Sequence, residues 1–347
     1  MRPPIIEEQE QALAYRDLKV LVTGADGFIG SHLVELLVKA GANVTALACY
    51  NSFDAHGWLD DLPGAVRDEL ALRRGDVRDP AFMRSVIQGQ DTVFHLAALI
   101  AIPHSYVAAR SYVDTNVVGT LNVLEAARDF GVRRVIHTST SEVYGSALTM
   151  PITEDHPLQG QSPYSASKIG ADMMAEAFAR SFELPVAILR PFNTFGPRQS
   201  ERAVIASILR QMLDSACETI EVGDTSTVRD FTFVEDTARA FLALGMAPAA
   251  SFGRPYNAGS GSAVSVNELL LLATELTGCS KPVRHAPARL RPDNSEVRAL
   301  LADSSRLTAN TGWRPSTTLR EGLLQTIDWW RDRLGRSLVR KNNDFMT

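Results

Sequence analysis

The fold is decided by the stretch Lys19-Val20-Leu21-Val22-Thr23-Gly24-Ala25-Asp26-Gly27-Phe28-Ile29-Gly30. Residues 19–23 form a short apolar run, as a buried parallel strand requires. Leucines at helical spacing between Ser31 and Ala40 predict a helix directly after the three glycines. Such glycines permit a tight turn and let a pyrophosphate approach the backbone at the helix N-terminus. The stretch therefore predicts dinucleotide binding rather than a simple turn.

Short apolar runs and helical patterns continue to alternate along the chain, which predicts an α/β fold built on a doubly wound parallel sheet. Pro and Gly crowd residues 190–198, where we predict a switch into a smaller α/β lobe that binds the substrate. The longest predicted helix covers 105–130. The predicted division is a loose extension at 1–16, a dinucleotide-binding domain at 17–192 with a returning segment at about 229–260, and the substrate lobe at 193–228 and 261–347.

Composition and charge exclude several classes of protein. The 347 residues are 45% hydrophobic, carry a formal net charge of −5 and contain no long basic run, which argues against a nucleic-acid partner. No apolar run reaches the ~18 residues of a membrane span, and the polar N-terminus lacks the core of a signal peptide. Cys49, Cys217 and Cys279 are scattered and have no metal spacing. We expect a cytoplasmic protein with reduced cysteines and no metal site.

Tyr164 and Lys168 are candidates for acid–base chemistry. A helix would place them on one face, because they are four residues apart. A free tyrosine has a pKa near ~10, and a neighbouring cation favours the phenolate and lowers that pKa. The pair is therefore suited to removing a proton from an alcohol. The alternative is a half-buried Tyr beside a solvated Lys.

Thr140, Ser141 and Glu142 follow a predicted strand at 132–138. In a doubly wound sheet, residues beyond the carboxyl ends of the strands face the binding crevice. We therefore predict that the three side chains belong to the site. The alternative is that they satisfy turn amides.

The acidic residue that usually binds the adenosine ribose is missing from its expected position. Ala48 and Cys49 stand there, about 20 residues after the glycine loop. No Arg stands close by for a 2′-phosphate, which favours NAD over NADP. Asn51 and Ser52 are predicted to replace the missing carboxylate. Asp76 is predicted to meet the adenine, with a turn or helix cap as its alternative role.

Four segments together resemble the extended short-chain dehydrogenases/reductases. They are Thr23–Gly30 (Thr-Gly-x-x-Gly-Phe-Ile-Gly), Tyr164-x-x-x-Lys168, Arg190–Arg198 (Arg-Pro-Phe-Asn-Thr-Phe-Gly-Pro-Arg) and Arg229–Val234 (Arg-Asp-Phe-x-Phe-Val). The resemblance covers about residues 18–335. It implies a Rossmann fold with bound NAD. It also implies a homodimer through the helices at 105–130 and 164–180.

Within that family, Thr140-Ser141-Glu142-Val143-Tyr144-Gly145 looks like the nucleotide-sugar 4,6-dehydratases. Sugar 4-epimerases usually have a small residue in place of Glu142. The dTDP-glucose branch has an Asp in place of Ser141, whereas the GDP-mannose branch has Ser and Glu. Tyr50–Phe53, Gly57–Asp60 and Arg198–Ser200 look most like the N-acetylglucosamine nucleotide dehydratases of legionaminic acid pathways.

This resemblance implies a hydro-lyase that makes a 4-keto-6-deoxy sugar nucleotide from GDP- or UDP-N-acetylglucosamine, for cell-surface polysaccharide. The implied catalytic residues are Thr140, Ser141, Glu142, Tyr164 and Lys168. The implied cofactor-binding residues are Gly24, Asp26, Gly27, Phe28, Ile29, Gly30, Asn51, Ser52, Asp76, Val77, Leu96, Ala97, Ala98, Asn116, Thr138, Tyr164, Lys168 and Pro191. The implied substrate-binding residues are Thr140, Ser141, Asn193, Arg198, Val204, Arg229 and Arg291, of which the three arginines are suited to a diphosphate.

Three alternatives remain open. UDP-glucuronate decarboxylases also carry Thr-Ser-Glu-Val-Tyr-Gly, but they usually have acidic and basic residues where this chain has Ser165-Ala166-Ser167. A nucleotide-sugar 4-epimerase is disfavoured by Glu142. A non-enzymatic NAD-sensing regulator typically loses the Tyr/Lys pair, which is intact here.

Overall fold

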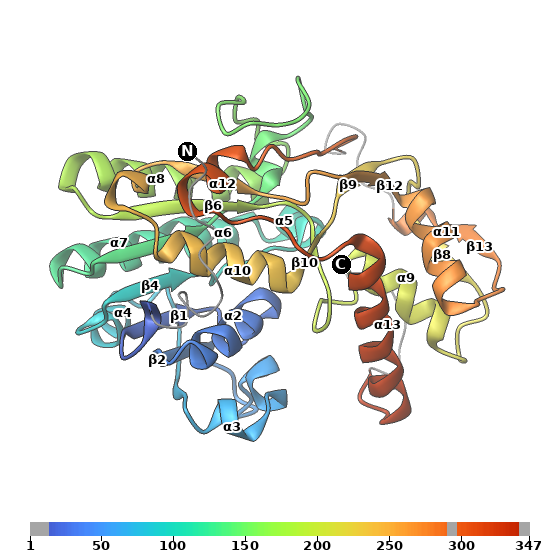
Figure 1. The fold of residues 1–347 in the computed structure, drawn as a ribbon, viewed down its shortest axis with the longest axis horizontal. Helices are drawn as coiled ribbons and strands as arrows, with labels where there is room; N and C mark the ends of the chain where they lie inside the picture. The colour runs from blue at the N-terminus through green and yellow to red at the C-terminus, as the bar shows by residue number, and fades with distance from the viewer. Residues whose placement is uncertain (1–13, 290–296, 340–347) are drawn as a thin grey trace.

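A seven-stranded parallel sheet forms the centre of the protein (Figure 1). The computed structural model describes residues 14–289 and 297–339. The strand order is β11-β6-β5-β4-β1-β2-β3, and every neighbouring pair is parallel. This is the doubly wound order of dinucleotide-binding folds with one further strand, so the predicted α/β class is confirmed. The strands are β1 (Lys19–Thr23), β2 (Asn43–Cys49), β3 (Ala71–Gly75), β4 (Thr92–His95), β5 (Arg134–Thr138), β6 (Val186–Pro191) and β11 (Pro255–Ala258).

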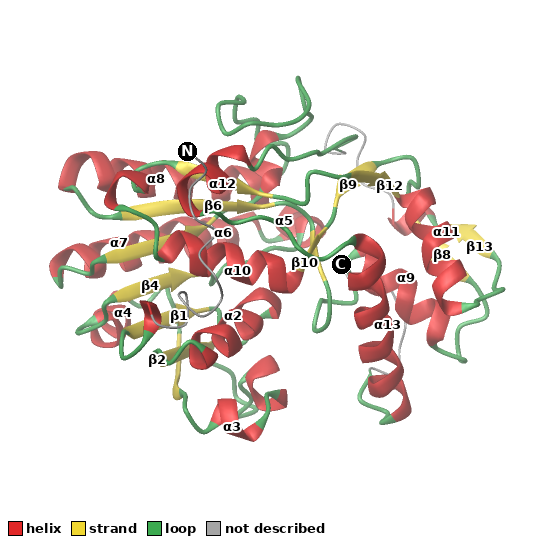
Figure 2. Cartoon of the chain, in the orientation of Figure 1, coloured by secondary structure: helices red, strands yellow, loops and turns green. Residues whose placement is uncertain are grey.

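Helices cover both faces of this sheet, as the red and yellow layers of Figure 2 show. One face packs against α2 (Phe28–Lys39) and α10 (Val234–Gly245), and the other against α4 (Pro80–Ile87), α7 (Gly119–Asp129) and α8 (Pro163–Phe182). Successive residues of a strand point to opposite faces. Val20 and Val22 accordingly join the first apolar cluster, while Leu21 joins the second. The strands are apolar on both faces because both are buried.

A third apolar cluster lies to the side of the sheet, and we call the elements that form or border it the small lobe (Figure 1). Its elements are α9 (Val204–Leu213), β8 (Ile220–Val222), α11 (Val266–Thr277), β13 (Val283–His285) and α13 (Leu319–Gly335). Two short strand pairs adjoin it, β7 (Thr194–Phe195) with β10 (Thr232–Phe233) and β9 (Val228–Asp230) with β12 (Ala263–Ser265). The division of the chain into a cofactor domain and a substrate lobe stays a prediction.

Short helices and turns connect these layers. They are α3 (Gly64–Arg67), α5 (Ile102–Val107), α6 (Ala109–Tyr112), α12 (Ser305–Thr311), the 3₁₀ turns η1 (Gly57–Asp61), η3 (Ser141–Tyr144), η4 (Ala249–Ser251) and η5 (Pro287–Arg289), and the π-helical segment η2 (Val113–Val118). Within 14–289 and 297–339, every helix is too short or too polar to cross a bilayer.

The single helix predicted over 105–130 is wrong. Helix α5 ends before Ala108, and α6 runs through η2 into α7. Widened turns of this kind are frequent at functional sites. Asn116 lies in η2, and its buried amide bonds both the N–H and the C=O of Leu99 after β4. The hydrophobic period could not reveal this interruption, because it reports only which face is apolar.

The predicted loose extension is wrong at Tyr15. Residues 1–13 lie outside those that the structure describes, but the Tyr15 side chain is fully buried. Its hydroxyl donates to the Leu242 carbonyl at 2.8 Å, and its ring lies 6.4 Å from that of Phe94. A lone aromatic among polar residues has no periodicity, so this burial could not be predicted from the local pattern.

Candidate active site

The glycine loop follows β1 at the point where the strand order reverses, between β1 and β4. Its glycines leave the backbone there accessible to a ligand. Gly24 has φ +68°, and a Cβ there would lie 2.7 Å from the Ala97 nitrogen. A Cβ on Gly30 would collide with the carbonyl of Gly24. Thr23 Oγ1 accepts hydrogen bonds from the amides of Leu96 (3.2 Å) and Ala97 (3.1 Å), which ties the loop after β4 to β1. Because α2 begins at Phe28, its N-terminus is suited to an anion such as a pyrophosphate.

Most of the other predicted cofactor residues lie beyond or at the ends of the parallel strands. Val77 follows β3, and Leu96, Ala97 and Ala98 follow β4. Thr138 and Pro191 are the last residues of β5 and β6. Asn116 joins this edge to α8, because its Nδ2 also donates to Ser167 Oγ at 2.9 Å. The sheet thus brings together residues that are distant in sequence, as expected for a doubly wound fold.

The Asn51 side chain is committed to its own loop. Nδ2 donates to the carbonyls of Cys49 (3.2 Å) and Ala55 (2.8 Å), while Oδ1 accepts from the amides of Phe53 (3.1 Å) and Ala55 (3.3 Å). An amide side chain has two donors and two acceptor sites, so the whole capacity of Asn51 is used. The carboxylate at the end of β2 comes instead from Asp26, whose Oδ2 accepts from the Cys49 amide at 3.1 Å.

Asp76 takes the capping role that was the alternative to adenine binding. Its Oδ1 accepts from the Arg78 amide at 2.9 Å, and its two oxygens lie 3.0 and 2.9 Å from Arg78 Nε. The hydrogen bond from Arg78 lowers the pKa of Asp76. A role toward the cofactor stays a prediction for this residue and for Ser52.

We expected no arginine near the adenosine end of the cofactor site. This expectation is wrong, because folding brings arginines from another strand to that place. Strands β2 and β3 pair with Ala48 opposite Arg74. Arg73 and Arg74 thereby line a cavity of about 570 Å³ together with residues 50–52. Arg74 also forms an ion pair with Asp54. Pairing between strands cannot be read from a single segment, which is why these arginines were missed.

Tyr164 and Lys168 lie on the buried face of α8. Ser162 caps this helix, because its hydroxyl accepts from the Ser165 amide at 3.1 Å while Ser165 Oγ accepts from the Ser162 amide at 3.0 Å. Pro163 occupies the first helical position, where its missing N–H has no cost. Tyr164 therefore stands in the first turn. Lys168 Nζ donates to the carbonyl of Thr138 at 2.6 Å.

The expected lowering of the Tyr164 pKa is wrong for this structure. Burial raises the pKa of Tyr164, and this exceeds the lowering by a hydrogen bond with the Thr140 side chain. Burial also lowers the pKa of Lys168 to about 8, against the opposing charge of Asp172. Both shifts follow from the cost of placing a charge in a dry site.

Thr140 and Glu142 adjoin the Tyr164 phenol. Thr140 Oγ1 accepts from the Glu142 amide at 3.2 Å, so Thr140 caps η3 as well as bonding Tyr164. Glu142 is half-buried, and its charge contributes to the raised pKa of Tyr164. Ser141 is buried beside it. A hydroxyl thus bonds the phenol, and the charge of a carboxylate acts on it, an arrangement suited to acid–base chemistry on an alcohol.

The predicted substrate residues have separate partners. Arg198 contacts α2, where it donates to Glu35 Oε1 at 2.7 Å, whereas Arg229 Nη1 donates to the Val228 carbonyl at 3.0 Å. Asn193 Nδ2 donates to the Asp230 carbonyl at 3.3 Å. Val204 begins α9, and Arg291 lies outside the described residues. Convergence of the three arginines on a diphosphate therefore stays a prediction.

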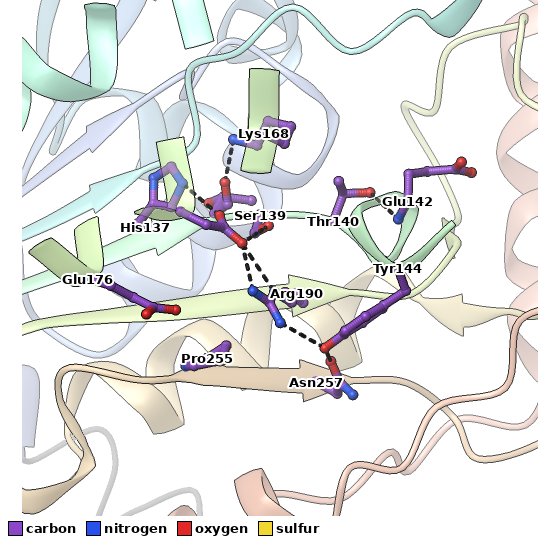
Figure 3. Close-up of polar contacts among 12 residues, drawn as sticks. His137, Ser139, Thr140, Glu142, Tyr144, Lys168, Glu176, Arg190, Pro255 and Asn257 are labelled. Atoms are coloured by element: carbon purple, nitrogen blue, oxygen red, sulfur yellow. Dashed lines mark hydrogen bonds and ion pairs between the residues drawn. The ribbon is translucent and has the colours of Figure 1, made fainter. Parts of the chain in front are cut away.

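A buried polar cluster behind Lys168 was missed by the sequence reasoning (Figure 3). Asp172 is fully enclosed, forms an ion pair with Arg190 (2.9 Å) and lies with Oδ1 3.3 Å from His137 Nε2. Arg190 also donates to the Tyr144 hydroxyl at 3.0 Å. The available signal was an Asp four residues after Lys168, which helical spacing places on the same face.

Comparisons with known proteins identify the family of this chain. The family model for GDP-mannose 4,6 dehydratase matches residues 21–326. The chain belongs to this family. The predicted membership of the extended short-chain dehydrogenases/reductases, in their branch of nucleotide-sugar dehydratases and epimerases, is thereby confirmed.

Relatives of both reaction types occur. A dTDP-glucose 4,6-dehydratase of Streptomyces griseus is 38% identical over 318 residues, covering 90% of this chain and 93% of the relative. A UDP-glucose 4-epimerase of Mycolicibacterium smegmatis is 32% identical over 321 residues, covering 91% and 99%. Among solved structures, a double mutant of DesIV, the dTDP-glucose 4,6-dehydratase of Streptomyces venezuelae, was determined with NAD and a second ligand. It has a TM-score of 0.82 and 32% identity, covering 92% of this chain and 98% of that one.

Proposed function

We propose that this protein is an NAD-dependent nucleotide-sugar 4,6-dehydratase, a hydro-lyase that makes a 4-keto-6-deoxy sugar nucleotide. The observation that carries the proposal is the position of Glu142, a half-buried carboxylate whose charge acts on the Tyr164 phenol. An epimerase needs one group to move the 4-hydroxyl proton. A dehydratase needs a second base as well, because it must also remove the hydrogen on carbon 5.

The residues around the glycine loop fit a dinucleotide, because the close approach at Gly24 and Gly30 leaves backbone amides exposed to a pyrophosphate. NAD, when bound, supplies the acceptor that takes a hydride from carbon 4 and returns it to carbon 6. The solved relative with NAD supports the choice of cofactor. We also propose that the protein prefers NAD to NADP. Asp54 forms an ion pair with Arg74, so the charge of this arginine is already engaged and is less suited to binding a 2′-phosphate.

The remaining steps belong to side chains. Tyr164, which Lys168 assists, removes the proton from the 4-hydroxyl, while Thr140 hydrogen-bonds the same oxygen. The 4-ketone acidifies the hydrogen on carbon 5, and Glu142 removes it as the general base. The 6-hydroxyl then leaves as water, protonated by Glu142 or by a water that Ser141 holds. A proton finally returns to carbon 5.

We further propose GDP- or UDP-N-acetylglucosamine as the substrate, with a product destined for cell-surface polysaccharide. Support comes from the resemblance of 50–53 and 57–60 to that branch of the dehydratases. In the fold, Trp58 of this segment packs 5.7 Å from Trp329, and Arg333 stacks 4.9 Å over Trp58. The segment thus joins the cofactor side to α13 of the small lobe, where we place the nucleotide sugar.

Product mass after incubation tests this proposal. GDP-N-acetylglucosamine, UDP-N-acetylglucosamine and UDP-glucuronate are each incubated with the protein and NAD. Loss of one water from an N-acetylglucosamine nucleotide supports the dehydratase. Loss of carbon dioxide from UDP-glucuronate would favour the decarboxylase. An unchanged mass with an inverted carbon 4 would favour the epimerase, the second candidate, which the 32% identical UDP-glucose 4-epimerase supports.

A further inference from the structure

Helix α8 carries a third buried polar residue in line with Tyr164 and Lys168. Asp172 follows Lys168 by four residues and Tyr164 by eight, so the three side chains share one helical face. Their exposed fractions fall along the stripe from 7% for Tyr164 to 3% for Lys168 and 0% for Asp172. The mechanism above uses the first two and leaves the third unexplained.

The Asp172 carboxylate is held firmly on one side. Oδ2 accepts from Ser139 Oγ at 2.8 Å and from Arg190 Nε and Nη2 at 3.1 and 2.9 Å. Oδ1 lies 3.3 Å from His137 Nε2. Figure 3 shows the dashed lines from His137, Ser139 and Arg190 meeting at one carboxylate, while the dashed line from Lys168 marks its hydrogen bond to the Thr138 carbonyl. The hydrogen bonds fix the carboxylate relative to β6, which carries Arg190, and to the residue that directly follows β5, Ser139.

The groups that face Lys168 leave Asp172 as its anionic neighbour. His95 on β4 and His137 on β5 are buried, and burial lowers the pKa of both, that of His137 to about 4. Both are therefore neutral at pH 7. Arg190 on β6 is a cation, bound to the far side of the carboxylate. Burial opposes ionisation of Asp172, but His137, Arg190 and Lys168 outweigh it and hold its pKa below the usual value.

We propose that Asp172 is a positioning residue, whose enclosed carboxylate keeps the Lys168 ammonium group charged beside Tyr164 on the same face of α8, while Ser139 and Arg190 hold that carboxylate in place. Lys168 Nζ donates a hydrogen bond to the Thr138 carbonyl. Asp172 therefore acts on the ammonium group by charge attraction rather than by a hydrogen bond, and the ammonium group remains available to the site. The inference rests on the proposed function only for the use that the site makes of Lys168.

Titration of Lys168 in the protein as purified tests this inference without turnover. The chain contains five lysines, Lys19, Lys39, Lys168, Lys281 and Lys341, so carbon-13 labelling of lysine Cε gives few NMR signals. Loss of one signal in Lys168→Arg assigns it. We expect a midpoint of about 8. A buried lysine without an anion titrates near ~5–6. A wild-type midpoint of about 6 or lower would overturn the proposal, whether or not any variant folds.

Variants then identify the anion. Asp172→Asn should lower the Lys168 midpoint by about one pH unit or more. The double variant Asp172→Asn with Arg190→Gln should lower the midpoint in the same way. It avoids leaving the buried Arg190 guanidinium without an anionic partner. Asp236→Asn is the matched control, because Asp236 is also fully buried and accepts from an arginine (Arg239, 2.7 Å) and a serine. The control should lose thermal stability and leave the Lys168 midpoint unchanged.

A purely structural Asp172 would give a different pattern. Its variants would lose stability like the control, and Lys168 would titrate as in the wild type, which would overturn the proposal. In turnover at pH 8, Asp172→Asn should lower kcat by about tenfold or more and leave KM nearly unchanged, because Asp172 reaches Lys168 and not the substrate. A protein that fails to release water from any nucleotide sugar, yet shows the shifted Lys168 midpoint, would contradict the proposed function and leave this inference standing.

Discussion

At the scale of single residues, the surroundings of a side chain decide what it can do, as burial raises the pKa of Tyr164. The glycine loop, Tyr164 and Lys168 were recognisable from spacing and Glu142 from its place after a strand, and Tyr164 and Lys168 do share the buried face of α8. The direction of the Tyr164 pKa was not predictable, because burial is set by elements far away in sequence. The same holds for Asn51, whose four hydrogen bonds belong to its own loop.

Gly24→Ala tests the dinucleotide site at this scale. The backbone there has φ +68°, and a Cβ would lie 2.7 Å from the Ala97 nitrogen, so the loop must shift. We expect a cost of about 1–3 kcal/mol in unfolding free energy and a loss of NAD affinity of at least about tenfold, measured by calorimetry. Gly64→Ala is the control, since its Cβ meets open space and should leave both quantities near wild type. Unchanged NAD affinity in Gly24→Ala would contradict the assignment of this loop.

At the scale of elements, strands and most helices were predictable because apolar runs and caps are local. The break of the 105–130 helix at Ala108 and its widened turn at η2 were not, since the buried contact between Asn116 of η2 and Leu99 joins segments that are apart in the sequence. Capping is a local feature that also bears on function, because Ser162 starts α8 and thereby places Tyr164 in its first turn.

Ser162→Ala tests that connection. Loss of the capping box should cost about 1 kcal/mol of unfolding free energy and also lower kcat, because the first turn of α8 carries Tyr164. Ser265→Ala is a matched control, since Ser265 and Glu268 form the same capping box on α11 in the small lobe. It should cost similar stability and leave kcat per folded protein unchanged. Equal kcat in both variants would show that the cap does not position Tyr164.

At the scale of the whole molecule, the doubly wound parallel sheet was predictable from the alternation of strands and helices, whereas contacts between distant segments were not. Exposed apolar side chains gather on the adjacent elements α5, η2 and α8, and they include Val107 (80% exposed), Val113 (45%) and Met173 (43%). We propose that this face forms a homodimer, since water-exposed apolar patches of this kind mark association sites.

Light scattering tests the dimer. We expect about twice the chain mass of 37.9 kDa at micromolar protein, and a monomer for Met173→Glu, because a charge on that face would be buried without a partner. Leu271→Glu, at a 65% exposed position of α11, should remain dimeric. A monomeric wild type would reject this surface as an interface.

The order of chemical steps is the central claim, and a single-turnover measurement with Glu142→Gln tests it most directly. Nucleotide sugar is mixed with NAD-loaded protein, reduced cofactor is followed by its absorbance, and product mass is read from the same sample. Glu142→Gln keeps the shape but removes the base, a step typically worth ~10²–10⁴-fold. Reduced cofactor should therefore accumulate without loss of water, whereas Tyr164→Phe should block both steps. Glu176→Gln, another half-buried carboxylate, which pairs with Arg180, should behave as wild type. Turnover per folded Glu142→Gln protein near the wild-type value would contradict the dehydratase assignment and favour the epimerase or decarboxylase.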